Sequence, residues 1–289
     1  MQNLYEKTKF IMKKYGITAN KSLGQNFLIN EEVVNTIVSS SEICKDDLVI
    51  EIGPGLGTLT EELLNNAGKV VAIELDERMI SILNDRFIAY SNFEVINQDV
   101  LKVNLNELIQ EQKQKYNLKN AKIVANLPYY ITTPIIMKLL EDKLDLESIT
   151  VMIQKEVADR LIATPGDRLS GAITYSVYYY AEAESVMIVD NNSFIPEPEV
   201  QSEVIKLKIR EQAPVIISDE KKFFSLIKVS FMQRRKTLLN ALVNGGILGN
   251  KDNAKFVFEK IGLDLNVRGE NLSIEDFKKL FDEIRKLYK

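Results

Sequence analysis

A glycine-rich turn is the first feature of the sequence whose residue types suggest a binding site. The stretch EIGPGLG places Gly53, Gly55 and Gly57 directly after an apolar run. A glycine turn after the first strand of an α/β sheet lets a nucleotide-like ligand approach the backbone. The GxGxG spacing lacks the GxGxxG pattern that holds a pyrophosphate, so we expect a cofactor without one. An ordinary tight turn is the alternative interpretation.

Two acidic residues follow the next two apolar runs. Glu74 ends the run that begins at Lys69 and is suited to accept hydrogen bonds from both hydroxyls of a ribose. Asp99 stands just beyond the run at 93–96, where a carboxylate can accept the exocyclic amine of adenine. A helix or turn cap is the alternative for Asp99. The pairing of a glycine turn with Glu74 is shared by NAD enzymes and S-adenosylmethionine (SAM) enzymes, and the glycine spacing favours SAM.

The most specific feature is the run Asn126-Leu127-Pro128-Tyr129 after the fourth apolar run. Adenine N6 is a poor nucleophile because its lone pair is delocalised into the ring. The Asn126 side-chain oxygen and the Leu127 carbonyl can hold the N6 hydrogens and leave the lone pair aimed at a methyl sulfonium. Pro128 fixes the loop, and Tyr129 offers a ring on which a base can stack. A turn followed by core tyrosines is the alternative.

Missing residue types exclude several other chemistries. The sequence contains no histidine, and its single cysteine is Cys44. Histidine-based nucleophilic sites and Cys/His zinc sites are therefore excluded, and we predict no metal. A sulfonium is already an activated donor, so methyl transfer requires no histidine base, and orientation supplies much of the rate.

The elements that must position these residues follow an alternating pattern from residue 48 to about 209. Strands are expected at 48–52, 69–73, 93–96, 122–125, 149–153, 185–189 and 204–209. Helix starts are indicated by Thr58 with Glu61 as a capping box, by Asp76, and by Thr133-Pro134. The alternation predicts an α/β fold, with a parallel sheet covered by helices on both faces.

Helical spacing replaces the strand signals beyond residue 210. It occurs at 221–229, 235–243, 254–261 and 273–286, the last opening with Ser273 and Asp276. We therefore predict two domains, one of residues 1–210 and a small helical one of residues 211–289.

Basic residues gather near the start of one of these expected helices. The net charge of the chain is −4, yet Arg234, Arg235 and Lys236 are consecutive. Cations in the first turn of a helix oppose its dipole unless an anion compensates, and phosphate is the natural candidate. Lys21 adds a possible phosphate contact from the N-terminal side. A solvated basic cap on a structural helix is the alternative.

Taken together, these motifs resemble the ribosomal RNA adenine N6-dimethyltransferase family. The resemblance also rests on KSLGQNFL at 21–28, FIPEPEVQS at 194–202 and QRRKTL at 233–238, in the family order over nearly the full length. Gln201 departs from the family, which commonly has aspartate there. The resemblance implies a Rossmann-like SAM methyltransferase sheet with helices on both faces, plus a small all-helical C-terminal domain.

The resemblance also implies roles for individual residues. The residues that it implies for cofactor binding are Asn26, Leu28, Gly53, Glu74, Asp99 and Asn126, with Gly55 of the same turn beside them. Tyr129 and Phe194 would sandwich the flipped target base. An aromatic core residue beside two prolines is the alternative for Phe194.

The activity that the resemblance implies is SAM-dependent transfer of two methyl groups to each of two adjacent adenosines near the 3′ end of small-subunit (16S) ribosomal RNA. The expected partner is this RNA within pre-30S particles. Residues 1–16 lack the features of a signal peptide and no apolar run is long enough to span a membrane, so we predict a cytoplasmic protein. We also expect a monomer. Two alternatives stay open: a large-subunit adenine methyltransferase of the antibiotic-resistance type, and a largely noncatalytic RNA-binding assembly factor.

Overall fold

The structure is a computed structural model that describes residues 3–20, 23–233 and 235–287. The chain divides into two compact units. The first contains Met1–Ala158 and Ala183–Ile209, and the second contains Asp159–Glu182 and Arg210–Lys289. The second unit thus includes the segment Asp159–Glu182, which the sequence pattern assigned to the first domain. The domains 1–210 and 211–289 stay a prediction.

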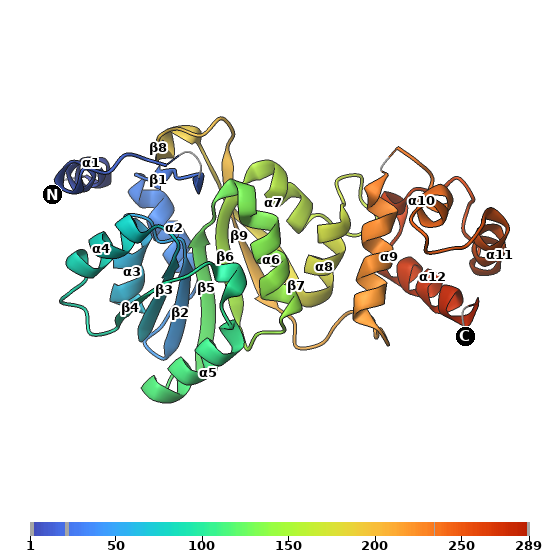
Figure 1. The fold of residues 1–289 in the computed structure, drawn as a ribbon, viewed down its shortest axis with the longest axis horizontal. Coiled ribbons are helices and arrows are strands. Elements are labelled where there is room, and N and C mark those ends of the chain that lie inside the picture. The colour runs from blue at the N-terminus through green and yellow to red at the C-terminus, as the bar shows by residue number, and fades with distance from the viewer. Residues whose placement is uncertain (1–2, 21–22, 234, 288–289) are drawn as a thin grey trace. The chain divides into compact units, whose positions relative to one another are not determined.

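A seven-stranded sheet forms the centre of the first unit (Figure 1). Its strands are β2 (Asp47–Ile52), β3 (Lys69–Glu74), β4 (Phe93–Asn97), β5 (Asn120–Asn126), β6 (Ser148–Gln154), β7 (Ala181–Val189) and β9 (Ser202–Ile209). Their order is β4-β3-β2-β5-β6-β9-β7. All seven strands expected from the sequence are confirmed.

Strand direction departs from the sequence prediction at one place. The pairs among β4, β3, β2, β5 and β6 are parallel, as predicted. The prediction of a parallel sheet is wrong for β9, which pairs antiparallel with β6. β9 follows its neighbour β7 through a stretch that contains only the short helix η4 (Asn191–Ser193) and strand β8 (Phe194–Ile195). A connection between neighbouring strands without a crossover helix reverses the direction of the chain, so β9 enters the sheet in the opposite direction.

The central strands of the sheet are buried on both faces. Val49 and Ile50 are successive residues of β2, so their side chains point to opposite faces, and both are fully buried. The helices of the first unit are α1 (Leu4–Tyr15), α2 (Glu31–Ser40), α3 (Thr58–Asn66), α4 (Glu77–Arg86), α5 (Leu105–Tyr116) and α6 (Thr132–Glu141), and α7 (Lys155–Ile162) follows β6. Ile37 of α2 and Leu63 of α3 join Val49 in one apolar cluster, while α5 contacts β2 and β5.

The three predicted helices begin where expected, but one of the predicted start signals is wrong. Asp76 caps α4 by accepting a hydrogen bond from the Arg78 amide, and Pro134 lies in the first turn of α6. The capping box at Thr58 is wrong, because the N-cap of α3 is Gly57 in the left-handed conformation, with no side-chain cap bond. Glu61 instead pairs with cations outside its own helix.

A two-stranded sheet joins distant parts of the sequence. β1 (Phe27–Leu28) pairs antiparallel with β8 (Phe194–Ile195), with Leu28 opposite Phe194. The N-terminal stretch QNFL and the later stretch FIPEP therefore lie side by side.

The second unit is built from helices around an aromatic core. They are α8 (Ala172–Tyr180), α9 (Glu220–Met232), α10 (Leu238–Asn244), α11 (Lys251–Ile261) and α12 (Ile274–Leu287). Tyr175 packs edge-on against Phe277 at 4.9 Å between ring centroids, and its hydroxyl donates to the Leu272 carbonyl at 2.5 Å.

The four predicted C-terminal helices are confirmed, but a start at Arg235 is wrong. Thr237 caps α10, which begins at Leu238.

Neither a membrane-spanning helix nor a metal-ligand cluster occurs in the described ranges. None of the helices there has the length and apolar character needed to cross a bilayer. Within the same ranges, no three Cys, Asp or Glu side chains gather as a metal site would require. The absence of a metal stays a prediction.

We predict that Gly57→Ala destabilises the first unit. Gly57 has φ +79°, and a Cβ there would lie 2.6 Å from the Phe87 ring and 2.9 Å from Leu83. The left-handed conformation and the overpacking together should lower the free energy of unfolding by about 2–4 kcal/mol. Gly16→Ala is the control, because Gly16 has φ +62° but no atom within 4 Å of the added Cβ. Its free energy of unfolding should fall by only about 1–2 kcal/mol. Urea denaturation measures both, and equal losses would refute the steric explanation.

Candidate functional site

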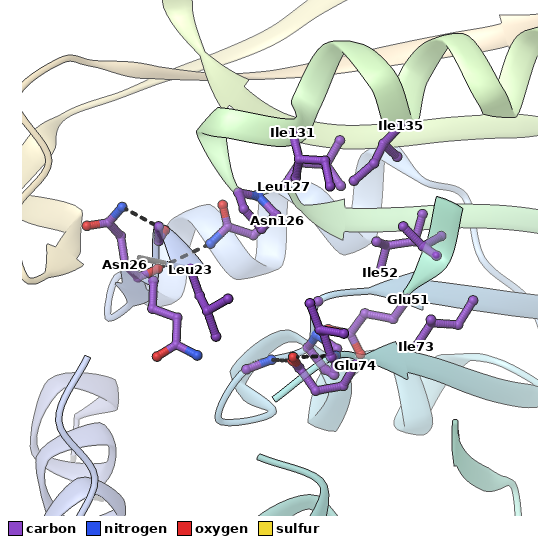
Figure 2. Close-up of a pocket in the computed structure, with 18 of the residues that line it drawn as sticks. Leu23, Asn26, Glu51, Ile52, Ile73, Glu74, Asn126, Leu127, Ile131 and Ile135 are labelled. Atoms are coloured by element: carbon purple, nitrogen blue, oxygen red, sulfur yellow. Dashed lines mark hydrogen bonds between the residues drawn. The ribbon is translucent and has the colours of Figure 1, made fainter. Parts of the chain in front are cut away.

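A cavity opens where β2, β3 and β5 end at their carboxyl ends (Figure 2). Its empty space, counted out to the open mouth, is about 1110 Å³, enough for a cofactor-sized ligand. All the residues predicted to contact the cofactor line it: Asn26, Leu28, Gly53, Gly55, Glu74, Asp99 and Asn126. Leu127, Pro128 and Tyr129 also line it, but Phe194 is not among the lining residues.

The glycine turn adopts a backbone that other residues rarely take. Gly53 and Gly55 have φ values of +67° and +56°, in the left-handed region where a Cβ is strained. The Gly53 amide donates to the Ile73 carbonyl at 2.9 Å, so the turn is tied to β3. The positive φ values explain why glycine occupies these two positions. Without side chains, the backbone of the turn is open to the cavity.

Glu74 connects the end of β3 to the glycine turn. Its Oε1 accepts hydrogen bonds from the amides of Leu75 at 2.8 Å and Asp76 at 2.9 Å, and its Oε2 accepts from the Gly55 amide at 3.2 Å (Figure 2). A carboxylate has about four acceptor sites, so Oε2 retains capacity for a ligand hydroxyl. Burial raises the pKa of the Glu74 carboxyl.

Asp99 forms the helix cap that the sequence offered as an alternative, and its contact with an adenine amine stays a prediction. Its Oδ1 accepts from the Leu101 amide at 3.0 Å, so it caps the short helix η2 (Val100–Lys102). It also borders the cavity beside Val100. The cap fixes the carboxylate at the rim of the site.

Glu51 is a site residue for which the sequence analysis assigned no role. Its carboxyl is fully buried at the cavity wall, and the Thr60 hydroxyl donates to its Oε2 at 2.6 Å. Burial raises the pKa of Glu51 to about 8, so this side chain is largely protonated near neutral pH. The signal in the sequence was a lone carboxylate within a buried apolar strand.

The N-terminal stretch around Asn26 forms another wall of the site. The Asn126 side-chain amide donates to the Asn26 carbonyl at 3.4 Å (Figure 2). The Gln25 side-chain amide donates to Asp76 Oδ2 at 2.9 Å. The ion pair with Arg78 lowers the pKa of Asp76, which keeps this acceptor charged. These bonds connect a segment far away in sequence to the ends of β3 and β5.

The loop after β5 is held at several points. The Leu127 amide donates to the Met152 carbonyl at 3.1 Å, and the Ile131 amide donates to the Pro128 carbonyl at 3.2 Å. The hydroxyl of Tyr129 lies 2.6 Å from the Ser202 hydroxyl. The loop therefore presents Asn126 and Tyr129 to the cavity from a fixed backbone.

Phe194 lies in the apolar core of the first unit, with only 1% of its surface exposed. It packs in the same cluster as Leu28 and Val33, so in this conformation it forms no sandwich with Tyr129. Its contact with a base stays a prediction, and that contact would require the ring to leave the core. Gln201, the departure from the family pattern, donates to Asp190 at 2.8 Å; an aspartate there would place two carboxylates together.

A separate group of cations occurs in the second unit. Arg235 and Lys236 are exposed in the turn before α10, whereas the predicted contacts Lys21 and Arg234 lie outside the described residues. Sequence patterns did not indicate two further exposed residues, Arg168 and Arg268.

The loops that carry these cations adjoin one another. The Ser170 hydroxyl donates to the Glu270 carbonyl at 3.3 Å, and the Leu238 amide donates to the Val267 carbonyl at 2.7 Å. Within residues 3–20, 23–233 and 235–287, none of the side chains of Arg168, Arg235, Lys236 and Arg268 forms an ion pair. The group combines residues widely separated in sequence, which is why no local pattern revealed it.

A glycine turn, an acidic strand end and an Asn-Leu-Pro-Tyr loop on one edge of this sheet define a Rossmann-like methyltransferase. Residues 16–286 match the sequence profile of the family described as ribosomal RNA adenine dimethylase. The chain belongs to this family.

Individual relatives agree with the family assignment. The chain is 47% identical over 282 residues to ribosomal RNA small subunit methyltransferase A of Bacillus pumilus, covering 97% of this chain and 96% of the relative. It is 48% identical to the protein of the same name from Clostridium botulinum, covering 95% and 97% of the two chains. Among solved structures, a dimethyladenosine transferase from Plasmodium falciparum has a TM-score of 0.74 at 29% identity, covering 90% of this chain and 98% of that one.

A more distant structure shares the fold. The 23S rRNA methyltransferase ErmE has a TM-score of 0.67 at 24% identity, with 90% of this chain and 100% of that chain covered.

We predict that Glu51→Gln alters how stability depends on pH. Burial favours the protonated form, so the pKa rises from 4.5 to about 8 on folding. The stabilisation by this proton is complete below pH 4.5 and is lost as the pH rises to about 8, by up to about 1.4 kcal/mol per pH unit. Glutamine keeps the size and an acceptor for Thr60 but does not titrate.

Urea unfolding of the two ligand-free proteins at pH 5.5 and pH 8 measures this difference. The free energy of unfolding of Glu51→Gln relative to the natural protein should rise with pH. A constant difference between the two proteins would show that Glu51 titrates normally.

Proposed function

We propose that this protein transfers methyl groups from SAM to the N6 amines of two adjacent adenosines near the 3′ end of small-subunit ribosomal RNA. The observation that carries the proposal is the single cavity shared by the predicted cofactor residues and the Asn126–Tyr129 loop. The names of relatives at 47% and 48% identity support the small subunit as the source of the RNA. The large-subunit enzyme ErmE shares only 24%, so the resistance-type alternative has less support.

The residues of the cavity fit SAM. The Glu74 carboxylate has remaining acceptor capacity for a ribose hydroxyl, and the Asp99 carboxylate borders the same space for an adenine amine. The backbone at Gly53 and Gly55 carries no side chain that would fill the cavity. When bound, SAM supplies a methyl group on a sulfonium, which is activated for transfer to nitrogen.

The chain contributes orientation to the transfer. Asn126 stands at the end of β5, with its side-chain nitrogen bonded to Asn26, which directs its oxygen away from that bond. That oxygen and the Leu127 carbonyl hold the two N6 hydrogens, and Tyr129 stacks on the base. Fixing the amine in this way converts an encounter between two molecules into a reaction within one complex.

The second unit supplies phosphate contacts in this proposal. Arg168, Arg235, Lys236 and Arg268 are exposed cations without ion pairs among the described residues. They suit the backbone of a folded RNA, and we extend this to Arg234 and Lys21 from their sequence positions. A monomer that acts on pre-30S particles in the cytoplasm completes the proposal.

We predict that Asn126→Ala abolishes methyl transfer in a folded protein. Loss of the acceptor should lower incorporation of labelled methyl groups into unmethylated small subunits by about 10²-fold or more, the scale found when one fixed polar group is removed from an active site. SAM affinity, measured by calorimetry, should fall much less. Asn66→Ala is the control, because the Asn66 side chain is exposed and, among the described residues, donates only to the Glu62 carbonyl of its own helix. Near-normal incorporation by Asn126→Ala would remove this residue from the mechanism.

We predict that Arg235→Ala with Lys236→Ala weakens subunit binding and its dependence on salt. Removing two phosphate contacts should make the slope of log K against log salt shallower by about 1–2. Lys278→Ala with Lys279→Ala removes equal charge from cations that pair with Asp282 at 2.7 Å and Asp276 at 3.6 Å, and it should leave the slope unchanged. Filter binding over a salt series measures both. Identical slopes in the two double variants would mean that the turn before α10 does not meet phosphate.

A further inference from the structure

A hydrogen bond joins the Asn126–Tyr129 loop to strand β9, which has no part in the proposed function. The hydroxyls of Tyr129 and Ser202 are 2.6 Å apart, and either atom can be the donor. Tyr129 lines the cavity, whereas Ser202 is fully buried. The two residues are 73 positions apart in the sequence, so this bond depends on the sheet.

Ser202 is itself fixed by the sheet. It is the first residue of β9 and lies opposite Gln154 of β6. The Lys155 amide donates to the Gln201 carbonyl at 3.0 Å, which clamps the strand at the residue before Ser202. The Ser202 hydroxyl is therefore a rigid point of attachment.

The bond determines the direction of the Tyr129 ring. The backbone bonds of Leu127 and Ile131 fix the loop on either side of Tyr129, but they leave its side chain free to rotate about the Cα–Cβ bond. Attaching the phenol oxygen at the far end of the ring fixes the long axis of the side chain. A ring anchored at both ends forms a defined wall for a stacked base.

We propose that Ser202 is a positioning residue, whose hydroxyl holds the Tyr129 ring in place as one wall of the base-binding site. The proposal rests on the proposed function, because it assigns Ser202 a part in placing the same target base. Packing of the strand is the competing explanation for a buried serine. The two explanations differ in whether the effect of Ser202 passes through the Tyr129 hydroxyl.

The test is a double-mutant cycle of Ser202→Ala and Tyr129→Phe, with methyl transfer to unmethylated small subunits as the readout. Each single variant should lower kcat/KM by about three- to tenfold, the size expected for one neutral hydrogen bond. The double variant should be no worse than either single one. Ser202→Thr retains a hydroxyl and should recover most of the activity. SAM affinity should be unchanged in all of them.

Ser148→Ala is the matched control. Ser148 is a buried serine at the opposite end of β6, where it lies across from Lys208 of β9. Its removal should leave kcat/KM unchanged, and melting temperatures show whether each variant is folded. Losses that multiply in the double variant, or wild-type activity in Ser202→Ala, would overturn the proposal.

A second readout does not depend on the RNA substrate. The ¹³Cζ resonance of labelled tyrosine reports the hydrogen bonding of the phenol, and its absence in Tyr129→Phe assigns it. Ser202→Ala should shift the Tyr129 resonance, while Ser148→Ala should not. An unmoved resonance would show that the bond is absent and would overturn the positioning role. If Ser202→Ala shifts the Tyr129 resonance but the wild-type protein does not methylate small subunits, only the proposed function is contradicted.

Discussion

Adjacent parallel strands end at the same edge of a sheet, and the whole site depends on this constraint. β3, β2 and β5 are neighbours in the order of the sheet, so the segments that follow them must meet. The chain places glycines after β2, Glu74 at the end of β3 and Asn126 at the end of β5. Asp99, just past β4, joins the same rim. One cavity therefore brings together the residues proposed to bind the donor and the residues proposed to hold the acceptor amine.

The electrostatics of the cavity fit a cationic donor. Glu51 and Glu74 are both buried at its wall, and burial raises the pKa of each carboxyl. Buried carboxyls without a full counter-charge favour a ligand that brings positive charge, because such a ligand restores their ionised form. A sulfonium with an amino group has that property, whereas a dinucleotide brings negative charge. The burial of these carboxyls and the GxGxG spacing thus both support the SAM cofactor of the proposal.

Local patterns predicted which strand ends and turns line the cavity, because strand ends and glycine turns leave signals within a few residues. Glu74, Asp99 and Asn126 follow apolar runs, and the structure brings them to one cavity. Features that depend on tertiary pairing were missed or wrong. The antiparallel β9, the bond between Tyr129 and Ser202, and the grouping of Arg168 with Arg268 join segments that are far apart. The start of α10 was misplaced because the side chain of Thr237, and not charge, decides where that helix begins.

The most direct test of the central claim is a crystal structure with S-adenosylhomocysteine and adenosine monophosphate. The account predicts the cofactor ribose at Glu74, its adenine beside Asp99, and the second base with its amine within hydrogen-bond distance of the Asn126 side chain and the Leu127 carbonyl. Cofactor bound at another edge of the sheet would contradict the account. So would a second base that binds away from the Asn126–Tyr129 loop.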